Sequence, residues 1–271
     1  MIERLAEKAG ENLSALRHTK PLIHNITNFV VMNYTANALL AMGASPVMAH
    51  AEGEVEEMVA IADALVLNTG TLTDSRIDAM LKAGKKANAL GIPVVLDPVG
   101  SGAISLRTTS AKRMIEELNI RVIRGNPSEI LSLRYSDSKT KGVETIHSVD
   151  EAADAGRILA LELNTTLAIT GPVDLVTDGK HVVRVGNGHP LMGYVTGTGC
   201  TASAAIGAFS AVDPDSLSAT AAALAFFGLA GEVAAEQTDA PGSFMIALID
   251  ALYTITPETL RNGCKIQYDL F

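Results

Sequence analysis

Residues 195–203, with the sequence VTGTGCTAS, are a dense cluster of small side chains that leads directly into an apolar stretch. We expect a loop that becomes the N-terminus of a buried helix at about Cys200. Gly197 and Gly199 have no side chains to cover their N–H groups, so several amides and the positive end of the helix dipole would converge there. This predicts an anion site, most naturally for phosphate, although a tight turn before a core helix has the same pattern.

Two carboxylates, Asp97 and Glu129, each follow a short apolar stretch that we expect to be a strand. Proteins commonly hold Mg²⁺ through one or two carboxylates, with water and substrate phosphates as the other ligands. Each residue also has a structural interpretation: Asp97 could form an Asx turn with Pro98, and Glu129 could match a helix dipole. Nearby, Arg124 could contact a phosphate through two N–H groups or be an ordinary surface charge.

A polar segment, HNITN at residues 24–28, precedes an expected helix at residues 31–42. Four hydrogen-bonding side chains in five positions are more than a turn requires. They could face a substrate, or Thr27 or Asn28 could cap the helix while the others are exposed to solvent.

Composition limits the class of protein. The 271 residues contain no linker-like stretch, so we expect a single domain over residues 1–271. A net charge of −9 argues against nucleic acid or an anionic membrane as a partner. Cys200 and Cys264 lack metal-ligand spacing, no signal peptide is visible, and the longest apolar run is too short to span a bilayer. These features predict a soluble, cytoplasmic protein.

The elements that must position these residues alternate regularly. After a first helix at 2–17 and a short apolar stretch at 21–23, we expect strands at 44–49, 64–68, 92–96, 122–124 and 166–170, and helices at 52–62, 74–90, 107–118 and 148–163, the last opened by a capping box at Ser148. Strands without polar alternation indicate a parallel sheet covered on both faces. A hairpin at 174–177 and 181–185 should form one edge, followed by three helices and no further strand.

The polar clusters all follow strands, so we expect them on one edge of the sheet, where ligands bind in open α/β folds. The clusters are at 68–70, 97–102, 124–129 and 170–172, and the small-residue loop at 195–200 follows the hairpin. Together they favour a phosphate and metal site over a set of unrelated connecting loops.

Several of these segments resemble a known family. DPVG at 97–100, NPSE at 126–129 and GTGC at 197–200 resemble the signature elements of the ribokinase-like kinases. IHNITN at 23–28, GASPVM at 43–48 and the cysteine in the anion loop are similar in detail to the hydroxyethylthiazole kinases of thiamine salvage. The resemblance runs from about residue 12 to about residue 255 and implies a three-layer α/β, ribokinase-like fold with a mostly parallel central sheet, helices on both faces and an edge hairpin.

The resemblance also implies an activity. It implies transfer of the ATP γ-phosphoryl group to the primary alcohol of 4-methyl-5-(2-hydroxyethyl)thiazole, with Mg²⁺, by a homotrimer whose thiazole pockets lie at subunit interfaces. By matching segments, Asn25 and Met48 would line the thiazole site, Gly197 would lie beside the alcohol, Arg124 and Thr170 would contact ATP, and Asp97 and Glu129 would serve the metal. Cys200 stands where most of the superfamily has an aspartate base.

The cysteine can be rationalised because a loose phosphoryl-transfer transition state depends on positioning and charge neutralisation more than on a base. Thr198, Gly199 and Cys200 are the candidate catalytic residues, and the amides of Gly199, Cys200 and Thr201 could supply the stabilisation. We expect the helix N-terminus to lower the pKa of the Cys200 thiol and bound ATP to raise it. Cys200 would then be a modest base or a positioning group.

Other functions remain open on the sequence alone. The same fold could serve a kinase for a pyrimidine or pyridoxal-type alcohol, or an ATP-dependent hydrate dehydratase. A non-catalytic nucleotide-binding protein is a more remote alternative, since the carboxylates and the anion loop form a complete set.

Overall fold

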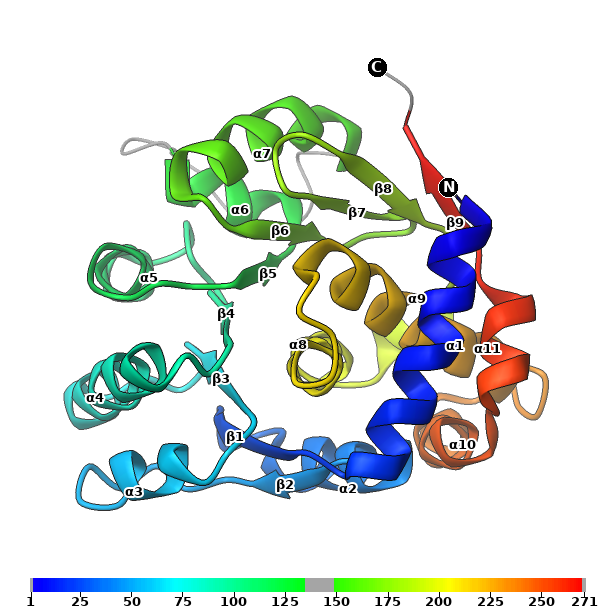
Figure 1. The fold of residues 1–271 in the computed structure, drawn as a ribbon, viewed down its shortest axis with the longest axis horizontal. Helices are drawn as coiled ribbons and strands as arrows, with labels where there is room; N and C mark the ends of the chain where they lie inside the picture. Colours follow the sequence, from blue (N-terminus) through cyan, green and yellow to red (C-terminus); the bar gives the residue numbers. More distant parts are fainter. Residues whose placement is uncertain (1, 135–148, 270–271) are drawn as a thin grey trace.

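The computed structural model describes residues 2–134 and 149–269, which form a nine-stranded sheet in the order β2-β1-β3-β4-β5-β6-β7-β8-β9 (Figure 1). The strands are β1 (Leu22–Ile26), β2 (Ser45–Val47), β3 (Ala64–Asn68), β4 (Val94–Asp97), β5 (Val122–Gly125), β6 (Thr166–Ile169), β7 (Asp174–Thr177), β8 (Val182–Val185) and β9 (Ile266–Tyr268). Strands β1 to β6 pair in parallel, whereas β7, β8 and β9 pair antiparallel with their neighbours. The expected mostly parallel α/β sheet is confirmed.

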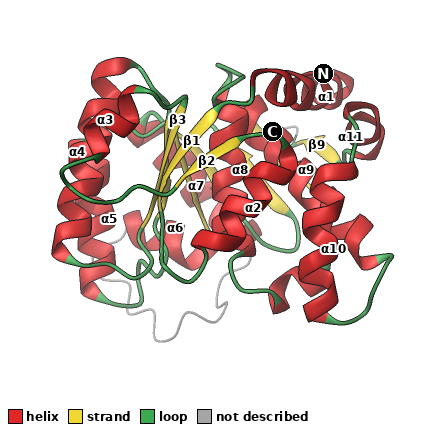
Figure 2. Ribbon diagram, turned by 90° about the horizontal axis from the view of Figure 1, so that it is seen from below, coloured by secondary structure: helices red, strands yellow, loops and turns green. Residues whose placement is uncertain are grey.

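Helices cover both faces of this sheet (Figure 2). One layer contains α3 (Val55–Ala60), α4 (Asp74–Leu90), α5 (Ser105–Glu117), α6 (Pro127–Arg134) and α7 (Val149–Leu163). The other contains α1 (Ile2–Thr19), α2 (Met32–Met42), α8 (Thr198–Ser210), α9 (Ser216–Ala235), α10 (Pro241–Thr254) and α11 (Pro257–Gly263), and the short 3₁₀ helix η1 (Pro190–Tyr194) precedes α8. All five residues of β3 are buried, as a strand covered on both faces requires.

The end of the chain differs from the expectation. Where three helices and no strand were expected after the anion loop, α11 and β9 follow α10, and β9 pairs antiparallel with β8. The β7–β8 hairpin is therefore inside the sheet, and β9 forms the edge. At three residues, β9 is too short for its sequence to show alternation, and its pairing is set by the long-range contact with β8.

Several boundaries differ by a few residues, and two of these differences affect the candidate site. Strand β1 extends through His24 and Asn25, so the polar segment at 24–28 begins inside a buried strand rather than after it. Helix α8 begins at Thr198, two residues earlier than expected, with Gly197 as its N-cap. The capping box expected at Ser148 lies outside the described residues.

Among the described residues, α9 alone is both long and apolar enough to qualify as a membrane span on length and composition, and 89% of the tested window is buried inside the protein. Because α1, α8, α10 and α11 all pack on it, α9 is a central helix of this layer.

Candidate active site

The first turn of α8 lies beside the carboxyl ends of the parallel strands, where Cys200 contacts Asn28 and Gly199 lies against Arg124. Gly197 adopts a positive φ of 94°, which turns the chain into the helix. Helix geometry leaves the amides of Thr198, Gly199 and Cys200 without intrahelical acceptors. The amide of Thr201, expected at the anion site, instead donates to Gly197 O at 2.8 Å, so Thr198 takes its place in the exposed set.

Arg124 lies against this first turn. A Cβ atom added to Gly199 would be 2.7 Å from Arg124 Nη1, which shows how closely the guanidinium approaches the helix backbone. Arg124 Nη2 donates to Thr170 Oγ1 at 2.5 Å, and its Nη1 lies 3.9 Å from Asp97 Oδ2. A positive side chain and the positive helix end therefore share one location, which is suited to an anion.

A cavity of about 520 Å³ opens at this location. Four of the candidate residues line it: Arg124, Thr170, Thr198 and Gly199. Asp174 also lines the cavity, and its Oδ1 accepts a hydrogen bond from Gly171 N at 2.9 Å. Burial raises the pKa of Asp174 to about 6. The sequence indicated Asp174 only as a hairpin residue, and its place beside Arg124 depends on the pairing of β6 with β7.

Asp97 is fully buried at the end of β4. Its Oδ2 accepts hydrogen bonds from Asn68 Nδ2 and Ser203 Oγ, both at 2.8 Å. Its Oδ1 is buried and has no hydrogen-bond partner among the described residues. Burial raises the pKa of Asp97 to about 6, against the favourable charge of Arg124. An unpartnered carboxylate oxygen at this position is suited to a cation or a metal-bound water.

Glu129 has a different environment. Its two carboxylate oxygens accept hydrogen bonds from Gly100 N and Asn126 N, each at 2.8 Å, and Asn126 Oδ1 accepts one from Glu129 N at 2.9 Å. Glu129 thus ties the loop after β4 to the start of α6, as the structural interpretation of a first-turn carboxylate anticipated. Its charge nevertheless reaches Asp97, whose pKa it raises further.

Within the described residues, no group of three or more His, Cys, Asp and Glu side chains is arranged to hold a metal ion. A Mg²⁺ ion that binds through one or two carboxylates plus water and phosphates does not need such a group. The unpartnered Asp97 Oδ1 therefore fits this type of magnesium site.

Cys200 is joined to Asp97 by two asparagines. Asn28 Nδ2 donates to Cys200 Sγ at 3.3 Å and to Asn68 Oδ1 at 3.0 Å, and Asn68 donates in turn to Asp97. Burial, followed by the negative charge of Asp97, raises the pKa of the Cys200 thiol to about 11. The expected lowering of this pKa is wrong, because desolvation and the carboxylate outweigh the hydrogen bonds from Asn68 and Asn28 and the charge of Arg124, which lower it. At neutral pH the thiol is protonated.

Sequence reasoning gave Asn68 and Ser203 no individual role and considered Asn28 only as a possible helix cap. The structure does not bear this out, because the N-cap of α2 is Val31, with no side-chain cap hydrogen bond. Asn28 and Asn68 stood in polar segments that were noted, but their contact requires β1 and β3 to be neighbours. Ser203 is three residues after Cys200 on α8, and this helical spacing could have indicated that both side chains face the same carboxylate.

Asn25 and Met48 lie apart from the large cavity, at the ends of the neighbouring strands β1 and β2. Asn25 is fully buried, and its Oδ1 has no hydrogen-bond partner among the described residues. Met48 is half-buried against the layer that contains α8. His24 Nε2 bonds to Ala49 O at 2.8 Å and so holds the loop that follows β2.

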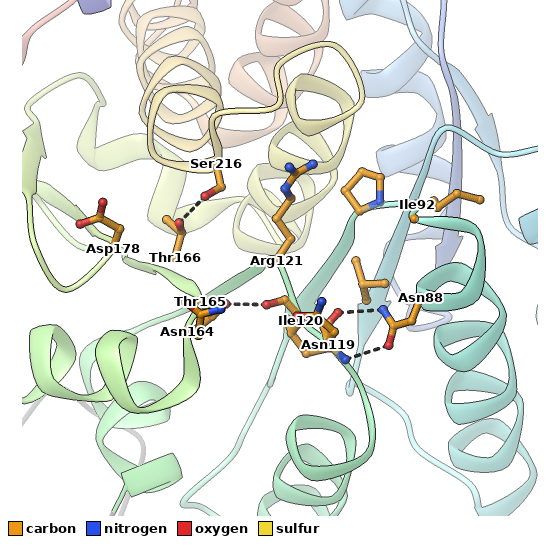
Figure 3. Close-up of a pocket in the computed structure, with 13 residues that line it drawn as sticks. Asn88, Ile92, Asn119, Ile120, Arg121, Asn164, Thr165, Thr166, Asp178 and Ser216 are labelled. Carbon is orange, nitrogen blue, oxygen red and sulfur yellow. Dashed lines mark hydrogen bonds between the residues drawn. The ribbon is translucent and has the colours of Figure 1, made fainter.

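A second cavity, of about 370 Å³, lies at the amino ends of β4, β5 and β6 (Figure 3). Its polar groups already bond to one another: Asn88 makes two hydrogen bonds to the backbone of Asn119, and Thr166 Oγ1 lies 2.6 Å from Ser216 Oγ (Figure 3). None of the candidate site residues lines it, so the site belongs to the other end of the sheet.

Known proteins resemble this chain over nearly its whole length. Residues 13–258 match the hydroxyethylthiazole kinase family. The chain belongs to the hydroxyethylthiazole kinase family. A hydroxyethylthiazole kinase of Desulfotalea psychrophila is 64% identical, over 96% of this chain and 95% of the relative. The structure of the hydroxyethylthiazole kinase from Pyrococcus horikoshii is 47% identical with a TM-score of 0.90, and the match covers 97% of this chain and 99% of that one.

The family places the protein among kinases with the ribokinase-like fold. A pyridoxal kinase from Staphylococcus aureus has a TM-score of 0.64 at 19% identity, with 92% of this chain and 98% of that chain covered, which is a likeness of fold alone. The expected family, fold and kinase activity are confirmed by these comparisons.

Proposed function

We propose that this member of the hydroxyethylthiazole kinase family transfers the γ-phosphoryl group of ATP to the primary alcohol of 4-methyl-5-(2-hydroxyethyl)thiazole. The observation that carries the proposal is that the first turn of α8 and Arg124 line the 520 Å³ cavity together, while the buried Asp97 lies behind them, with its Oδ2 3.9 Å from Arg124 Nη1. These groups suit a reaction in which negative charge must be held and neutralised during phosphoryl transfer.

ATP would occupy the large cavity. Arg124 and Thr170, already joined by a hydrogen bond, would contact the nucleotide, and the amides of Thr198 and Gly199 would bind its phosphates. Fixed amides need no reorganisation when charge shifts during the reaction, so we propose that they stabilise the transition state more than any side chain does.

Mg²⁺ would supply charge neutralisation at the phosphates when bound. Asp97 would hold it, directly or through water, with its unpartnered Oδ1. Glu129 would contribute its negative charge and keep the two loops beside the metal in place, because both of its oxygens already accept backbone amides.

Cys200 would position the substrate alcohol rather than remove its proton. A thiol with a pKa near 11 is almost fully protonated at neutral pH, so little thiolate exists to act as a base. The S–H group can donate to the alcohol while Sγ accepts from Asn28.

The thiazole ring would bind near Asn25 and Met48, with Gly197 beside the alcohol. We propose that a homotrimer completes this site at subunit interfaces. Apolar side chains are exposed on the adjoining α2 and α10, including Leu40 at 58% and Ile246 at 63%, and an interface would bury them.

We further propose that residues 1–271 act as one domain and that the enzyme is cytoplasmic, where its two cysteines would remain free thiols.

ADP release in the presence of ATP, Mg²⁺ and a panel of alcohols tests the substrate. We expect release with the thiazole alcohol, and little with pyridoxal or a hydroxymethylpyrimidine. No thiazole-dependent ADP formation would contradict the proposal, and ATP binding without turnover on any alcohol would indicate a nucleotide-binding protein.

A further inference from the structure

Arg76, in the first turn of α4, is a buried arginine that has no acidic partner among the described residues. The residue is 3% exposed, and no carboxylate of the described residues acts on its charge. Its Nε and Nη1 are buried and have no hydrogen-bond partner in the described part of the chain. Burial lowers the pKa of Arg76. A buried, unpaired guanidinium is destabilising, so its presence calls for a role other than stability.

In the described part of the chain, the hydrogen bond and the ring contact of the Arg76 guanidinium both fall on one loop, the connection between β1 and α2. Arg76 Nη2 donates to the carbonyl of Thr27, and the guanidinium carbon lies 4.4 Å from the centroid of the Phe29 ring. Phe29 N donates to Thr71 Oγ1 at 3.2 Å, from a loop in which Thr71 itself has a positive φ of 46°. The guanidinium thus holds the residues on both sides of Asn28.

Asn28 is the residue that reaches the reaction centre, through its bonds to Cys200 and Asn68. Arg76 stands on the 17-residue helix α4, so it links a rigid element to a loop that has no regular structure of its own. We propose that Arg76 is a positioning residue, which clamps the β1–α2 loop so that Asn28 bonds to the Cys200 thiol and to Asn68. The proposal rests on the proposed function, because that function gives Cys200 its part in turnover.

Alkylation of Cys200 in the ATP-free enzyme tests this without requiring turnover. The Asn28 hydrogen bond favours the thiolate, so its loss should slow alkylation by about 3- to 10-fold, the equivalent of one neutral hydrogen bond. We expect this decrease in Arg76→Met and in Asn28→Ala, with no further decrease in the double variant. The rate is measured at Cys200 by peptide mass spectrometry, because Cys264 is also a free thiol.

Steady-state kinetics give a second readout. In Arg76→Met we expect kcat with the thiazole alcohol to fall about 3- to 10-fold, with KM for ATP unchanged and the melting temperature equal or higher. Arg76→Lys, which keeps a charge able to reach Thr27 O and Phe29, should recover part of the loss. Arg113→Met, at an exposed arginine of α5, is the matched control and should change neither readout.

An unchanged or faster Cys200 alkylation in Arg76→Met, or decreases that multiply in the double variant, would overturn the proposal. So would a lowered melting temperature with unchanged alkylation, which is the result expected of a purely structural arginine. If the wild-type enzyme does not phosphorylate the thiazole alcohol, the proposed function fails, while the alkylation cycle still decides the role of Arg76.

Discussion

Asp97 is completely buried, and among the described residues only one of its two carboxylate oxygens, Oδ2, accepts hydrogen bonds. Its pKa, raised by burial to about 6 from 3.8, means that the folded protein binds a proton there more tightly than the unfolded chain does. This carboxyl group therefore contributes stability below about pH 4, and the contribution is lost as pH rises through about 6. At neutral pH the charge is kept at a cost in stability, which is typical of a functional carboxylate.

Asp97→Asn should separate these two effects. At about pH 7 we expect the free energy of unfolding of the variant to exceed that of the wild type by on the order of 1–3 kcal/mol. This difference should disappear below about pH 4, where Asp97 is protonated in the wild type. Turnover should fall by roughly 100-fold or more, because the negative charge for the metal is gone. Denaturant unfolding at several pH values and ADP release provide the measurements. A variant that is less stable at neutral pH and still active would contradict this account of Asp97.

Cys200 allows a test of the positioning role. Cys200→Ser should leave measurable turnover, within about tenfold of wild type, because a hydroxyl also accepts from Asn28 and donates to the alcohol. Cys200→Asp should equal or exceed the wild-type rate, since a carboxylate is the stronger proton acceptor. Initial rates of thiazole-dependent ADP formation measure both. Complete loss in both variants would show that the thiol has another role.

At the scale of elements, the start of α8 depends on Gly197. Its φ of 94° is unfavourable for a residue with a Cβ, and an added Cβ would lie 2.7 Å from Val31 Cγ1. The first turn of α8 therefore keeps its direction only while this position is glycine.

Gly197→Ala should cost about 1–3 kcal/mol in the free energy of unfolding and should also raise KM for ATP, because the helix amides are displaced. Gly242→Ala is the control: nothing lies within 4 Å of a Cβ added at this position of α10. Thermal unfolding and steady-state kinetics distinguish the two variants. Equal stability of both would contradict the importance of the Gly197 conformation.

The elements show what local sequence could predict. Helix α4 was predicted with its bounds, because a long helical stretch runs into Gly91; in the structure Gly91 ends the helix in the left-handed region and Thr73 caps its start. Strand β3 was predicted because its residues are apolar at consecutive positions, which is typical of a strand covered on both faces of a parallel sheet. Strand β9 and the inclusion of His24 and Asn25 in β1 were missed, since both depend on neighbouring strands and not on local pattern.

The same limit applies to the site. The sequence placed Asp97, Arg124 and the α8 loop on one edge, because the ends of parallel strands meet there. The hydrogen bonds among Asn28, Asn68 and Cys200 could not be predicted, since they join residues up to 172 positions apart. The pKa of Cys200 was predicted with the wrong sign because burial and Asp97 are properties of the fold. The catalytic, binding and metal roles of the candidate residues all stay predictions; these residues are Asn25, Met48, Asp97, Arg124, Glu129, Thr170, Gly197, Thr198, Gly199 and Cys200.

At the scale of the whole molecule, the exposed apolar side chains of α2 and α10 are the surface proposed for the trimer. A Leu40→Glu, Ile246→Glu double variant should be a folded monomer with reduced thiazole turnover, because two charges would be buried in the interface. Light scattering on a sizing column gives the mass. Ile158→Glu, at an exposed position of α7, is the control. A trimer that persists in the double variant would place the interface elsewhere.

The burial of helix α9 affects the order in which the protein can fold during synthesis. Its 20 residues are almost entirely buried, and α10 and α11, which cover part of it, come later in the chain. While the polypeptide leaves the ribosome, this alanine- and leucine-rich helix is complete before those covers exist. We therefore expect the chain to reach its final packing only after release, and nascent chains that stop before α10 to require chaperones or to aggregate.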